Sequence, residues 1–304
     1  MSLIQGVDMR SARRISTIAM AAVLTISAAA ACGDDKKKDS SSGSGDKKTI
    51  ELKAGSTMKK LADAKKVKVG VKFDQPGFGQ KDPASGKVAG FDVEIAKLIA
   101  AEMGIPESGI EFVETVSKNR EPFIQEGKVD FVVATYTIND KRKELVAFAG
   151  PYYTAHQDMM VKKGNPKGIK KVTDLDGKKV CSVKGSTSEK NLKEKAPQAT
   201  PVLFEKYTEC AEELRNDKVD AVTTDDVILG GLIDKAKDDF ELVGDKFTDE
   251  PYGIGVKKED TDFRNFINDV LEKSYTGGGW KTAYKETVGK FLSDVPEPPK
   301  VNRY

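Results

Sequence analysis

The chain has 304 residues, and its 50 Lys and Arg residues nearly balance its 48 Asp and Glu residues, for a formal net charge of +2. This balance argues against a dedicated nucleic-acid-binding protein, which would carry a basic excess. Apolar residues make up 38% and charged residues 32%, an ordinary composition with enough chain for two modest domains. One histidine and three cysteines almost exclude a metal site built on these residues, and a Ser-His-Asp hydrolase would have to use His156. We expect neither a metal nor a cofactor.

Residues 1–31 have the pattern of a lipoprotein signal peptide. Three arginines form a basic region before an apolar, alanine-rich stretch at 15–31. The segment Ala29-Ala-Ala-Cys32 resembles the lipobox of bacterial lipoproteins, in which the cysteine is lipidated and becomes the first residue of the mature chain. Ala29 stands where that pattern usually has Leu, so plain secretion with cleavage near the same alanines is the alternative.

Residues 32–59 are expected to form a disordered linker after the lipidated cysteine. From Gly33 to Lys48 the chain holds only Asp, Lys, Ser and Gly residues. A segment without apolar side chains cannot bury a core. It would tether the folded part to a membrane and leave that part free to reorient.

The predicted elements that follow are typical of an α/β protein. Alternation at period two predicts a half-buried strand at 67–73, and apolar residues at helical spacing predict an amphipathic helix that begins near Asp92 and ends before Gly104. Further strands are expected at 110–113 and 131–134, with a helix around 122–125 between them. Strands and helices that alternate in this way indicate an α/β fold.

A short pattern occurs twice. The segment Lys128-Val-Asp-Phe-Val-Val-Ala-Thr135 is echoed by Lys218-Val-Asp-Ala-Val-Thr-Thr224. Two α/β lobes of similar plan explain the echo economically. Chance similarity between two buried strands is the alternative.

Polar side chains follow the predicted strand at 131–134 directly. Thr135 and Thr137 supply hydroxyl groups, and Arg142 comes within the next helical turn. A guanidinium group can bind both oxygens of a carboxylate, and charge-assisted hydrogen bonds are about twice as strong as neutral ones. The stretch therefore suggests a grip for a small carboxylate, although a solvated helix start would show the same residues.

Several motifs carry a family resemblance over about residues 64–293. They are Gly90-Phe-Asp-Val-Glu-Ile95, Thr135-Tyr-Thr-Ile-Asn-Asp-Lys-Arg142, Phe148-Ala-Gly-Pro-Tyr-Tyr153, Val172-Thr-Asp-Leu-Asp-Gly-Lys-Lys-Val180 and Pro251-Tyr-Gly-Ile-Gly-Val256. In this order they resemble the polar amino-acid solute-binding proteins of ABC importers, the bacterial extracellular solute-binding family 3. Val71-Lys-Phe-Asp-Gln-Pro-Gly77, Val180-Cys-Ser-Val-Lys-Gly-Ser-Thr-Ser188 and Val222-Thr-Thr-Asp-Asp226 are similar, more closely, to glutamate-binding lipoproteins of actinobacteria.

The resemblance implies a two-lobed, periplasmic-binding-protein-like α/β fold. Two crossing strands would join the lobes, which close on a ligand by a hinge motion. Lobe 1 would comprise residues 60–156 plus 251–295, lobe 2 residues 157–250, and a tail residues 296–304. We expect the protein to be a monomer.

The same resemblance implies which residues bind the α-carboxylate and α-ammonium groups of an amino-acid ligand. Arg142, helped by Thr137, would hold the α-carboxylate. Ser186, Thr187 and Ser188 open a predicted helix of lobe 2, where free N–H groups favour an anion. Asp225 would hold the α-ammonium group and Thr135 would accept a second hydrogen bond from it. The alternative for Asp225 is a helix N-cap, a role that we expect Asp226 to fill.

The side-chain end of the ligand has three candidate partners. A γ-carboxylate needs a cation or several donors, because a desolvated, unpaired charge is very costly. Lys72 and Lys184 could supply the cation, and Gln75 could donate its amide. The alternative for each lysine is the solvated end of a strand.

Two of the cysteines are expected to pair. With Cys32 lipidated, Cys181 and Cys210 remain within lobe 2. A disulfide between them suits an exported protein. Two free, buried thiols are the alternative.

The expected function is binding without catalysis. The protein would sit on the extracellular face of the cell membrane through its lipid anchor, capture L-glutamate, and deliver it to an ABC permease and, through the permease, to ATPase subunits. Glutamine or aspartate is the alternative ligand. A small-acid dehydratase on the same scaffold is a weaker alternative, because an enzyme needs a tuned acid or base beside its substrate. No nucleic acid is expected as a partner.

Overall fold

The computed structural model describes residues 52–292 and 294–304. The predicted signal peptide (1–31), the lipidation of Cys32 and most of the predicted linker lie outside the described residues. Everything below concerns the unit that contains residues 52–304.

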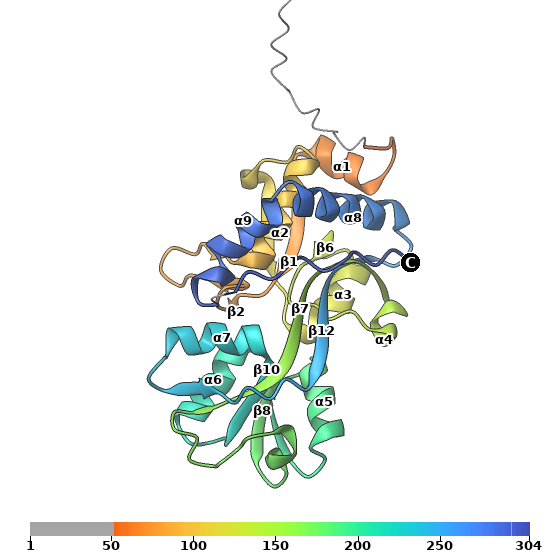
Figure 1. Cartoon of the computed structure of the whole chain (residues 1–304). Helices are drawn as coiled ribbons and strands as arrows, with labels where there is room; N and C mark the ends of the chain where they lie inside the picture. Colours follow the sequence, from red (N-terminus) through yellow and green to blue (C-terminus); the bar gives the residue numbers. More distant parts are fainter. Residues whose placement is uncertain (1–51, 293) are drawn as a thin grey trace, which may run out of the picture. The chain divides into compact units, whose positions relative to one another are not determined.

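Three groups of elements make up this unit (Figure 1). Lobe 1 contains α1 (Thr57–Ala64), β1 (Val67–Val71), β2 (Asp74–Gln75), β3 (Gly79–Lys81), β4 (Val88–Ala89), α2 (Phe91–Glu102), β5 (Ile110–Glu114), α3 (Arg120–Gln125), β6 (Phe131–Val132), α4 (Asp140–Lys143), α8 (Thr261–Thr276) and α9 (Gly279–Glu286). Lobe 2 contains β8 (Lys179–Val183), α5 (Thr187–Lys195), β9 (Thr200–Phe204), α6 (Tyr207–Arg215), β10 (Ala221–Asp225), α7 (Asp226–Lys235) and β11 (Phe240–Leu242). Two long strands, β7 (Val146–Lys162) and β12 (Thr248–Lys257), run through both lobes.

One mixed sheet passes through both lobes. Among the described residues its order is β5-β1-β6-β12-β7-β10-β8-β9, with β11 also paired to β7. The strands β5, β1 and β6 are parallel within lobe 1, and β10, β8 and β9 are parallel within lobe 2. The antiparallel pair β7 and β12 lies between these halves. The α/β, two-lobed fold that the sequence predicts is therefore confirmed.

The repeated sequence pattern has a repeated structural role. The Asp130 carboxylate accepts from the backbone N–H of Lys68 at 2.7 Å, and the Asp220 carboxylate accepts from the N–H of Lys179 at 2.9 Å. In both lobes the residue after the aspartate pairs with the residue after the lysine in a parallel ladder. Each aspartate thus sets the register of a central strand, which explains why the two segments look alike.

Helix α2 buries the face that its sequence predicts. Val93, Ala96 and Ala100 are fully buried, and so are Ile95 and Ile99 beside them. The helix begins at Phe91, after Gly90. Burial of an apolar stripe of this size stabilises a helix far more than its intrinsic propensity does.

Two predicted strands are shorter than expected. The first ends at Val71 and the third at Val132, where 73 and 134 were expected. The cause for the third is visible, because the carbonyl of Ala134 accepts from the Arg120 guanidinium at 3.2 Å. A side chain therefore takes the place of a neighbouring strand.

Both ends of the described unit are attached to lobe 1. Helix α1 begins at Thr57, within the range 32–59 expected to be a linker, and its Thr57 hydroxyl donates to Asp260. In the predicted tail 296–304, Val301 is buried and the N–H of Asn302 donates to the Gly150 carbonyl at 2.8 Å. The tail continues along β7, where the Tyr304 hydroxyl accepts from the N–H of Phe148 at 2.9 Å.

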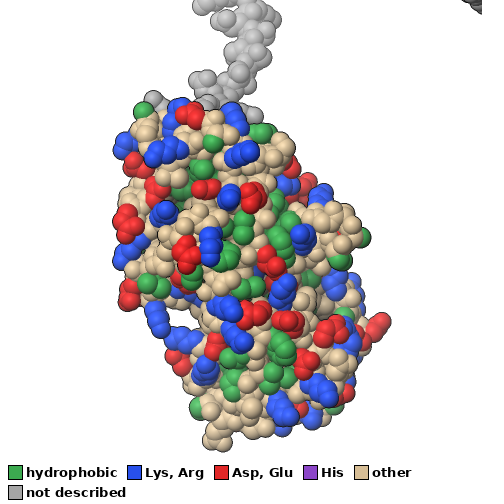
Figure 2. Space-filling model, turned by 180° about the vertical axis from the view of Figure 1, so that it is seen from behind, with side chains coloured by type: hydrophobic (Ala, Val, Ile, Leu, Met, Phe, Trp, Pro, Cys, Tyr) green, Lys and Arg blue, Asp and Glu red, His purple; other side chains and the backbone are tan. Residues whose placement is uncertain are grey.

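The surface mixes charges of both signs. Figure 2 shows Lys and Arg side chains interspersed with Asp and Glu over both lobes on one face. Within residues 52–292 and 294–304, no helix is long and apolar enough to cross a bilayer. The same part of the chain brings together no group of three His, Cys, Asp or Glu residues placed to hold a metal ion.

Lobe 2 contains the predicted disulfide. Cys181 on β8 and Cys210 on α6 are joined, with their Cα atoms 5.5 Å apart and a separation of 29 in sequence. Both residues are fully buried. The prediction of a Cys181–Cys210 pair is confirmed.

Loss of this disulfide should destabilise the protein. Because the bond closes a loop of 29 residues, reduction should lower the free energy of unfolding by about 3–4 kcal/mol in the chain-entropy estimate. Urea unfolding with and without reductant measures the difference. The double variant Cys181→Ala/Cys210→Ala is the control, since reductant should not change its stability. An equal response of both proteins would contradict the prediction.

Candidate functional site

The buried carboxylate of Asp92 stabilises the turn that follows β6. Thr135 has a left-handed backbone with φ of 43°, and its N–H donates to Asp92 Oδ2 at 2.9 Å. The other oxygen of Asp92 accepts from the Tyr152 hydroxyl at 2.6 Å. Burial raises the pKa of Asp92 to about 6, and these two donors partly oppose that rise. The network fixes a conformation that a non-glycine residue adopts at a cost.

Two buried arginines lie over the Tyr136 ring. The guanidinium carbon of Arg120 lies 4.4 Å from the ring centroid and that of Arg142 lies 5.1 Å from it. Arg120 also donates to the Thr135 carbonyl at 3.1 Å, and Arg142 donates to the Thr137 carbonyl at 2.7 Å. The backbone of 135–137 is thus held by both cations.

Arg142 is paired with an acidic side chain of lobe 1. Its Nε lies 3.2 Å from Glu121 Oε1. Burial, and next the nearby Arg120, lower the pKa of Arg142 to about 10. A second carboxylate, such as that of a ligand, would therefore relieve an excess of positive charge at this point.

Lobe 2 contributes a backbone carbonyl between the two arginines. Gly185 O accepts from Arg142 Nη2 at 3.2 Å and from Arg120 Nη2 at 3.5 Å. Beside it, the Thr137 and Thr187 hydroxyl oxygens are 3.4 Å apart. A pocket of about 580 Å³ lined by Arg142, Gly185 and Thr187 opens at this junction.

Further contacts hold the lobes together away from the arginines. The N–H of Tyr207 at the start of α6 donates to Asp74 Oδ2 of β2 at 2.8 Å. Lys118 of lobe 1 donates to Glu205 of lobe 2 at 2.8 Å. These contacts describe a closed arrangement of the two lobes.

The start of α5 holds the three predicted hydroxyl residues in different positions. Ser186 is the N-cap, and its hydroxyl accepts from the N–H of Glu189 at 3.0 Å. Thr187 faces Thr137 of the other lobe. Ser188 is buried against the sheet, where its hydroxyl donates to Thr224 at 3.2 Å.

Asp225 lies at the end of β10 and is buried. It occupies the N-cap position of α7, but its side chain makes no capping hydrogen bond. Its Oδ2 accepts from the Tyr252 hydroxyl at 2.5 Å. Asp226, which we expected to be the cap, is the first residue of the helix and accepts from the N–H groups of His156 and Val227.

Lys72 and Gln75 lie in the same buried region of lobe 1. Gln75 Oε1 accepts from the Thr135 hydroxyl at 2.9 Å, which joins two predicted site residues. Lys72 is 2% exposed and donates to the Ser117 hydroxyl at 2.7 Å. Burial, with Arg120 second, lowers the pKa of Lys72 to about 7.

Lys184 is not brought to this region. Its side chain is 51% exposed, and its Nζ lies 3.7 Å from Glu205. The strand β8 ends one residue earlier, at Val183, so Lys184 projects from the exposed loop that leads to α5. The structure therefore agrees with the alternative given for Lys184, the solvated end of a strand, and not with a ligand contact.

Sequence reasoning missed four residues of the region: Asp92, Arg120, Glu250 and Tyr252. Asp92 was interpreted as a helix start and Arg120 was not singled out. Arg120 is one of few arginines in a lysine-rich chain, which is a weak signal for a fork-shaped contact. Glu250 stands two residues before Tyr252 in a predicted crossing strand, and no pattern distinguishes its carboxylate from a solvated one.

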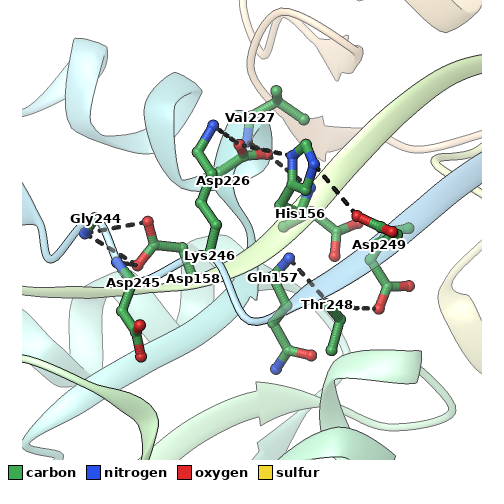
Figure 3. A network of polar contacts seen from close by, with 12 residues as sticks. His156, Gln157, Asp158, Asp226, Val227, Gly244, Asp245, Lys246, Thr248 and Asp249 are labelled. Atoms are coloured by element: carbon green, nitrogen blue, oxygen red, sulfur yellow. Dashed lines mark hydrogen bonds and ion pairs between the residues drawn. The ribbon is translucent and has the colours of Figure 1, made fainter.

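The crossing strands are tied to lobe 2 by a polar network (Figure 3). His156, the single histidine, is partly exposed and lies between Asp226 at 3.7 Å and Asp249 at 3.4 Å. Asp158 accepts from the N–H groups of Gly244 and Asp245, each at 3.1 Å. The network fixes the point at which both strands enter lobe 2.

Comparison with known proteins gives a consistent picture. Residues 67–290 match the model of the bacterial extracellular solute-binding proteins, family 3. The ABC transporter glutamine-binding protein GlnH of Bacillus subtilis is 40% identical over 91% of this chain and 97% of its own. The glutamate-binding protein GluB of Corynebacterium glutamicum is 38% identical over 92% of each chain. The structure of an ancestral arginine-binding protein bound to glutamine superposes with a TM-score of 0.69 at 36% identity, covering 75% of this chain and 98% of that one.

A methyl group at Gly185 should separate the lobes. Gly185 has φ of +75°, and a Cβ there would lie 2.8 Å from Lys118 Cα of the other lobe. Gly177, also in lobe 2 and also at φ of +75°, has nothing within 4 Å of the corresponding position. Both Gly→Ala variants should lose about 1 kcal/mol of stability to backbone strain.

Only Gly185→Ala should increase the radius of gyration measured by small-angle X-ray scattering, because only its methyl group meets the opposite lobe. Equal radii for Gly185→Ala, Gly177→Ala and the wild type would contradict the prediction.

Proposed function

We propose, since the chain belongs to the bacterial extracellular solute-binding proteins of family 3, that it captures L-glutamate between its lobes and delivers it to an ABC importer. Its relatives include proteins named for glutamine and for glutamate binding. Partners under this proposal are a permease and, through it, ATPase subunits. Lobe 1 comprises 60–156 plus 251–295 and lobe 2 comprises 157–250.

One observation carries the proposal. Two cations of lobe 1, Arg142 and Lys72, and one carboxylate of lobe 2, Asp225, are buried. An α-amino acid with an acidic side chain is the small molecule that offers two anionic groups and one cationic group. Bound between the lobes, it would supply the counter-charges that burial makes favourable.

Under this proposal each residue of the site binds a different group of the ligand. Arg142 holds the α-carboxylate with the Thr137 hydroxyl, and the start of α5 at 186–188 adds contacts from lobe 2. Asp225 holds the α-ammonium group, and Thr135 accepts a second hydrogen bond from it. Lys72 holds the γ-carboxylate, with Gln75 as a neighbouring donor.

The choice of glutamate over glutamine rests on Lys72. Lys72 Nζ donates to the Ser117 hydroxyl, and no carboxylate within residues 52–292 and 294–304 bonds directly to it. A γ-carboxylate would compensate that charge, and a γ-amide would not. Glutamine remains the second candidate, because the relative with 40% identity is named as a glutamine-binding protein.

The proposal includes attachment of the protein to the cell surface. A lipid on Cys32 would anchor the protein to the extracellular face of the membrane, with residues 1–31 removed as a signal peptide and the following residues as a tether. The folded part would act as a monomer, since capture of one ligand by two lobes of one chain requires no second copy.

A catalytic role is the weaker alternative. Lys72 and Asp225 have pKa values shifted toward neutrality by burial, a property that catalytic groups share. We propose that both act as ligand partners, because each has an oppositely charged ligand group to bind. Glutamate incubated with the protein should be recovered unchanged, as proton NMR would show, and any conversion would favour the enzyme.

The direct test is calorimetric titration of the purified protein after unfolding and refolding to strip bound ligand. Glutamate, glutamine, aspartate and histidine would be titrated in parallel. Tight binding of glutamate above the others supports the proposal. Selective binding of glutamine would keep the site and overturn the role of Lys72, and binding of none would overturn the proposed function.

Removal of the Arg142 guanidinium should weaken glutamate binding severely. Loss of one partner from a desolvated charge pair costs about 2–5 kcal/mol, so Arg142→Ala should raise the dissociation constant about thirtyfold or more. Lys141→Ala is the control, because Lys141 is exposed and lines the same pocket. A change of only a few fold in Arg142→Ala would rule out this role.

Glutamate selectivity should decline with rising pH. In the protein without ligand the pKa of Lys72 is about 7. Above neutral pH this lysine is therefore mostly uncharged, and it must take up a proton from solvent when glutamate binds. The ratio of glutamate to glutamine affinity should fall as pH rises from 7 to 9, by up to about tenfold per pH unit.

The variants Lys72→Met and Lys184→Met form a matched pair of lysine removals. Lys72→Met should make the affinity ratio low and independent of pH, whereas Lys184→Met should behave like the wild type. A ratio that is constant with pH in the wild type would argue against Lys72 as the γ-carboxylate partner.

A further inference from the structure

Two buried carboxylates, Asp225 and Glu250, project from the same face of the crossing sheet. Gln157 of β7 pairs with Asp225 of β10 on one side and with Thr248 of β12 on the other. Paired residues share a face of a sheet, and so do residues two apart on one strand. Glu250 therefore lies on the face of Asp225, two residues beyond Thr248.

Each carboxylate has one oxygen engaged and one without a partner. Asp225 Oδ2 accepts from the Tyr252 hydroxyl at 2.5 Å. Glu250 Oε1 accepts from Asn191 Nδ2 and from the Thr248 hydroxyl, both at 2.9 Å. Asp225 Oδ1 and Glu250 Oε2 are buried and have no hydrogen-bond partner among the described residues. A buried carboxylate oxygen without a donor is costly, so two in one place point to a missing donor.

The surrounding charges favour a cation between these oxygens. Burial, and next the carboxylate of Glu250, raise the pKa of Asp225 to about 8. Among the described residues, the ionisable groups that also act on Asp225 include Tyr252, Asp226, Arg120 and Tyr207. Arg142 interacts with Glu250 from the side of lobe 1. Lys246 lies 2.8 Å from Asp226 and is therefore engaged away from the central pair.

We propose that Asp225 and Glu250 together bind the α-ammonium group of the ligand, and that Asp225 keeps a proton whenever that ammonium group is absent. Burial and the nearby carboxylate of Glu250 both disfavour the charged form of Asp225. When the ammonium group binds between Oδ1 and Oε2, it replaces the proton of Asp225, which leaves to solvent. The inference rests on the proposed function for the ligand's α-amino group and adds Glu250 to that site.

A purely structural role for Glu250 makes a different prediction. Its Oε1 ties Asn191 of α5 to Thr248 of the crossing strand. Glu250→Gln keeps an oxygen for both donors and replaces Oε2 with an amide that can donate to Asp225 Oδ1. If Glu250 only held these elements together, this variant would bind ligand as the wild type does.

The first experiment separates the ammonium contact from the fold. The titrations use glutamate and glutarate, which keeps both carboxylates but lacks the amino group, with the full wild-type chain and with Glu250→Gln. The variant should bind glutamate about tenfold more weakly or worse and should bind glutarate as well as the wild type or better. Asp249→Asn is the control, since Asp249 directly precedes Glu250, has a side chain that is 83% exposed, and points to His156 (Figure 3).

Two results would overturn the inference. One is a Glu250→Gln variant that binds glutamate within twofold of the wild type. The other is an equal loss for glutamate and glutarate, which would indicate a structural role. A wild type that binds no α-amino acid would overturn the proposed function itself, and so is distinguishable from both.

The second experiment detects the proton of Asp225 directly and needs no ligand. Carbon-13 NMR of the side-chain carboxyl groups should show a resonance that titrates above pH 7 in the wild type and is missing from Asp225→Asn. In Glu250→Gln this resonance should titrate at least one pH unit lower, because the like charge is gone. A resonance that does not move between wild type and Glu250→Gln would refute the proposed coupling of Glu250 to the proton of Asp225.

Discussion

The carbonyl of Gly185 between two buried guanidinium groups is the contact on which the closed structure depends. Arg120 and Arg142 reach it from lobe 1 while they also hold the backbone of the Thr135 turn. The same two cations therefore shape the half of the site in lobe 1 and fasten it to lobe 2. An uncharged donor would do this less well, because a buried guanidinium group must satisfy several N–H groups at once and each carbonyl that it binds is held in place.

Burial of charge makes this interface specific. Burial removes four charged side chains from water: Lys72, Arg142, Asp92 and Asp225. The pKa of each shifts in the direction that favours its neutral form, down for the lysine and the arginine and up for the two aspartates. Such groups lower the stability of the protein unless something compensates them. Within the fold, Tyr152 and Tyr252 compensate the two aspartates in part through their hydroxyl groups. A zwitterionic ligand with an anionic side chain can complete that compensation. Because a ligand without these charges cannot do so, the buried charges make binding selective.

The crossing strands serve as hinge and as part of the site. β7 and β12 carry Gln157, Glu250 and Tyr252 on the face toward the site and Asp158 and Asp249 on the other. The second set, with His156, Lys246 and the backbone around Gly244, fastens the strands to lobe 2. Lobe movement and ligand contact thus involve neighbouring residues of the same strands. An altered charge on the face toward the site will therefore be felt at the ligand.

The sequence by itself determined the local and periodic features. The buried stripe of α2 and the paired strands that begin after Asp130 and Asp220 follow from spacing and residue type, because each depends on near neighbours. The expected roles of Arg142 and Asp225 come from the motifs of the family that the chain resembles, and the cysteine pair follows from the small number of cysteines. Tertiary structure alone decided which charges are buried together. Lys72 and Lys184 both follow a strand, yet one is enclosed beside Arg120 and the other is solvated beside Glu205. Arg120 and Glu250 gain their roles from contacts across 65 residues and across two strands. Desolvation and like-charge proximity depend on the whole fold, and no local pattern records them.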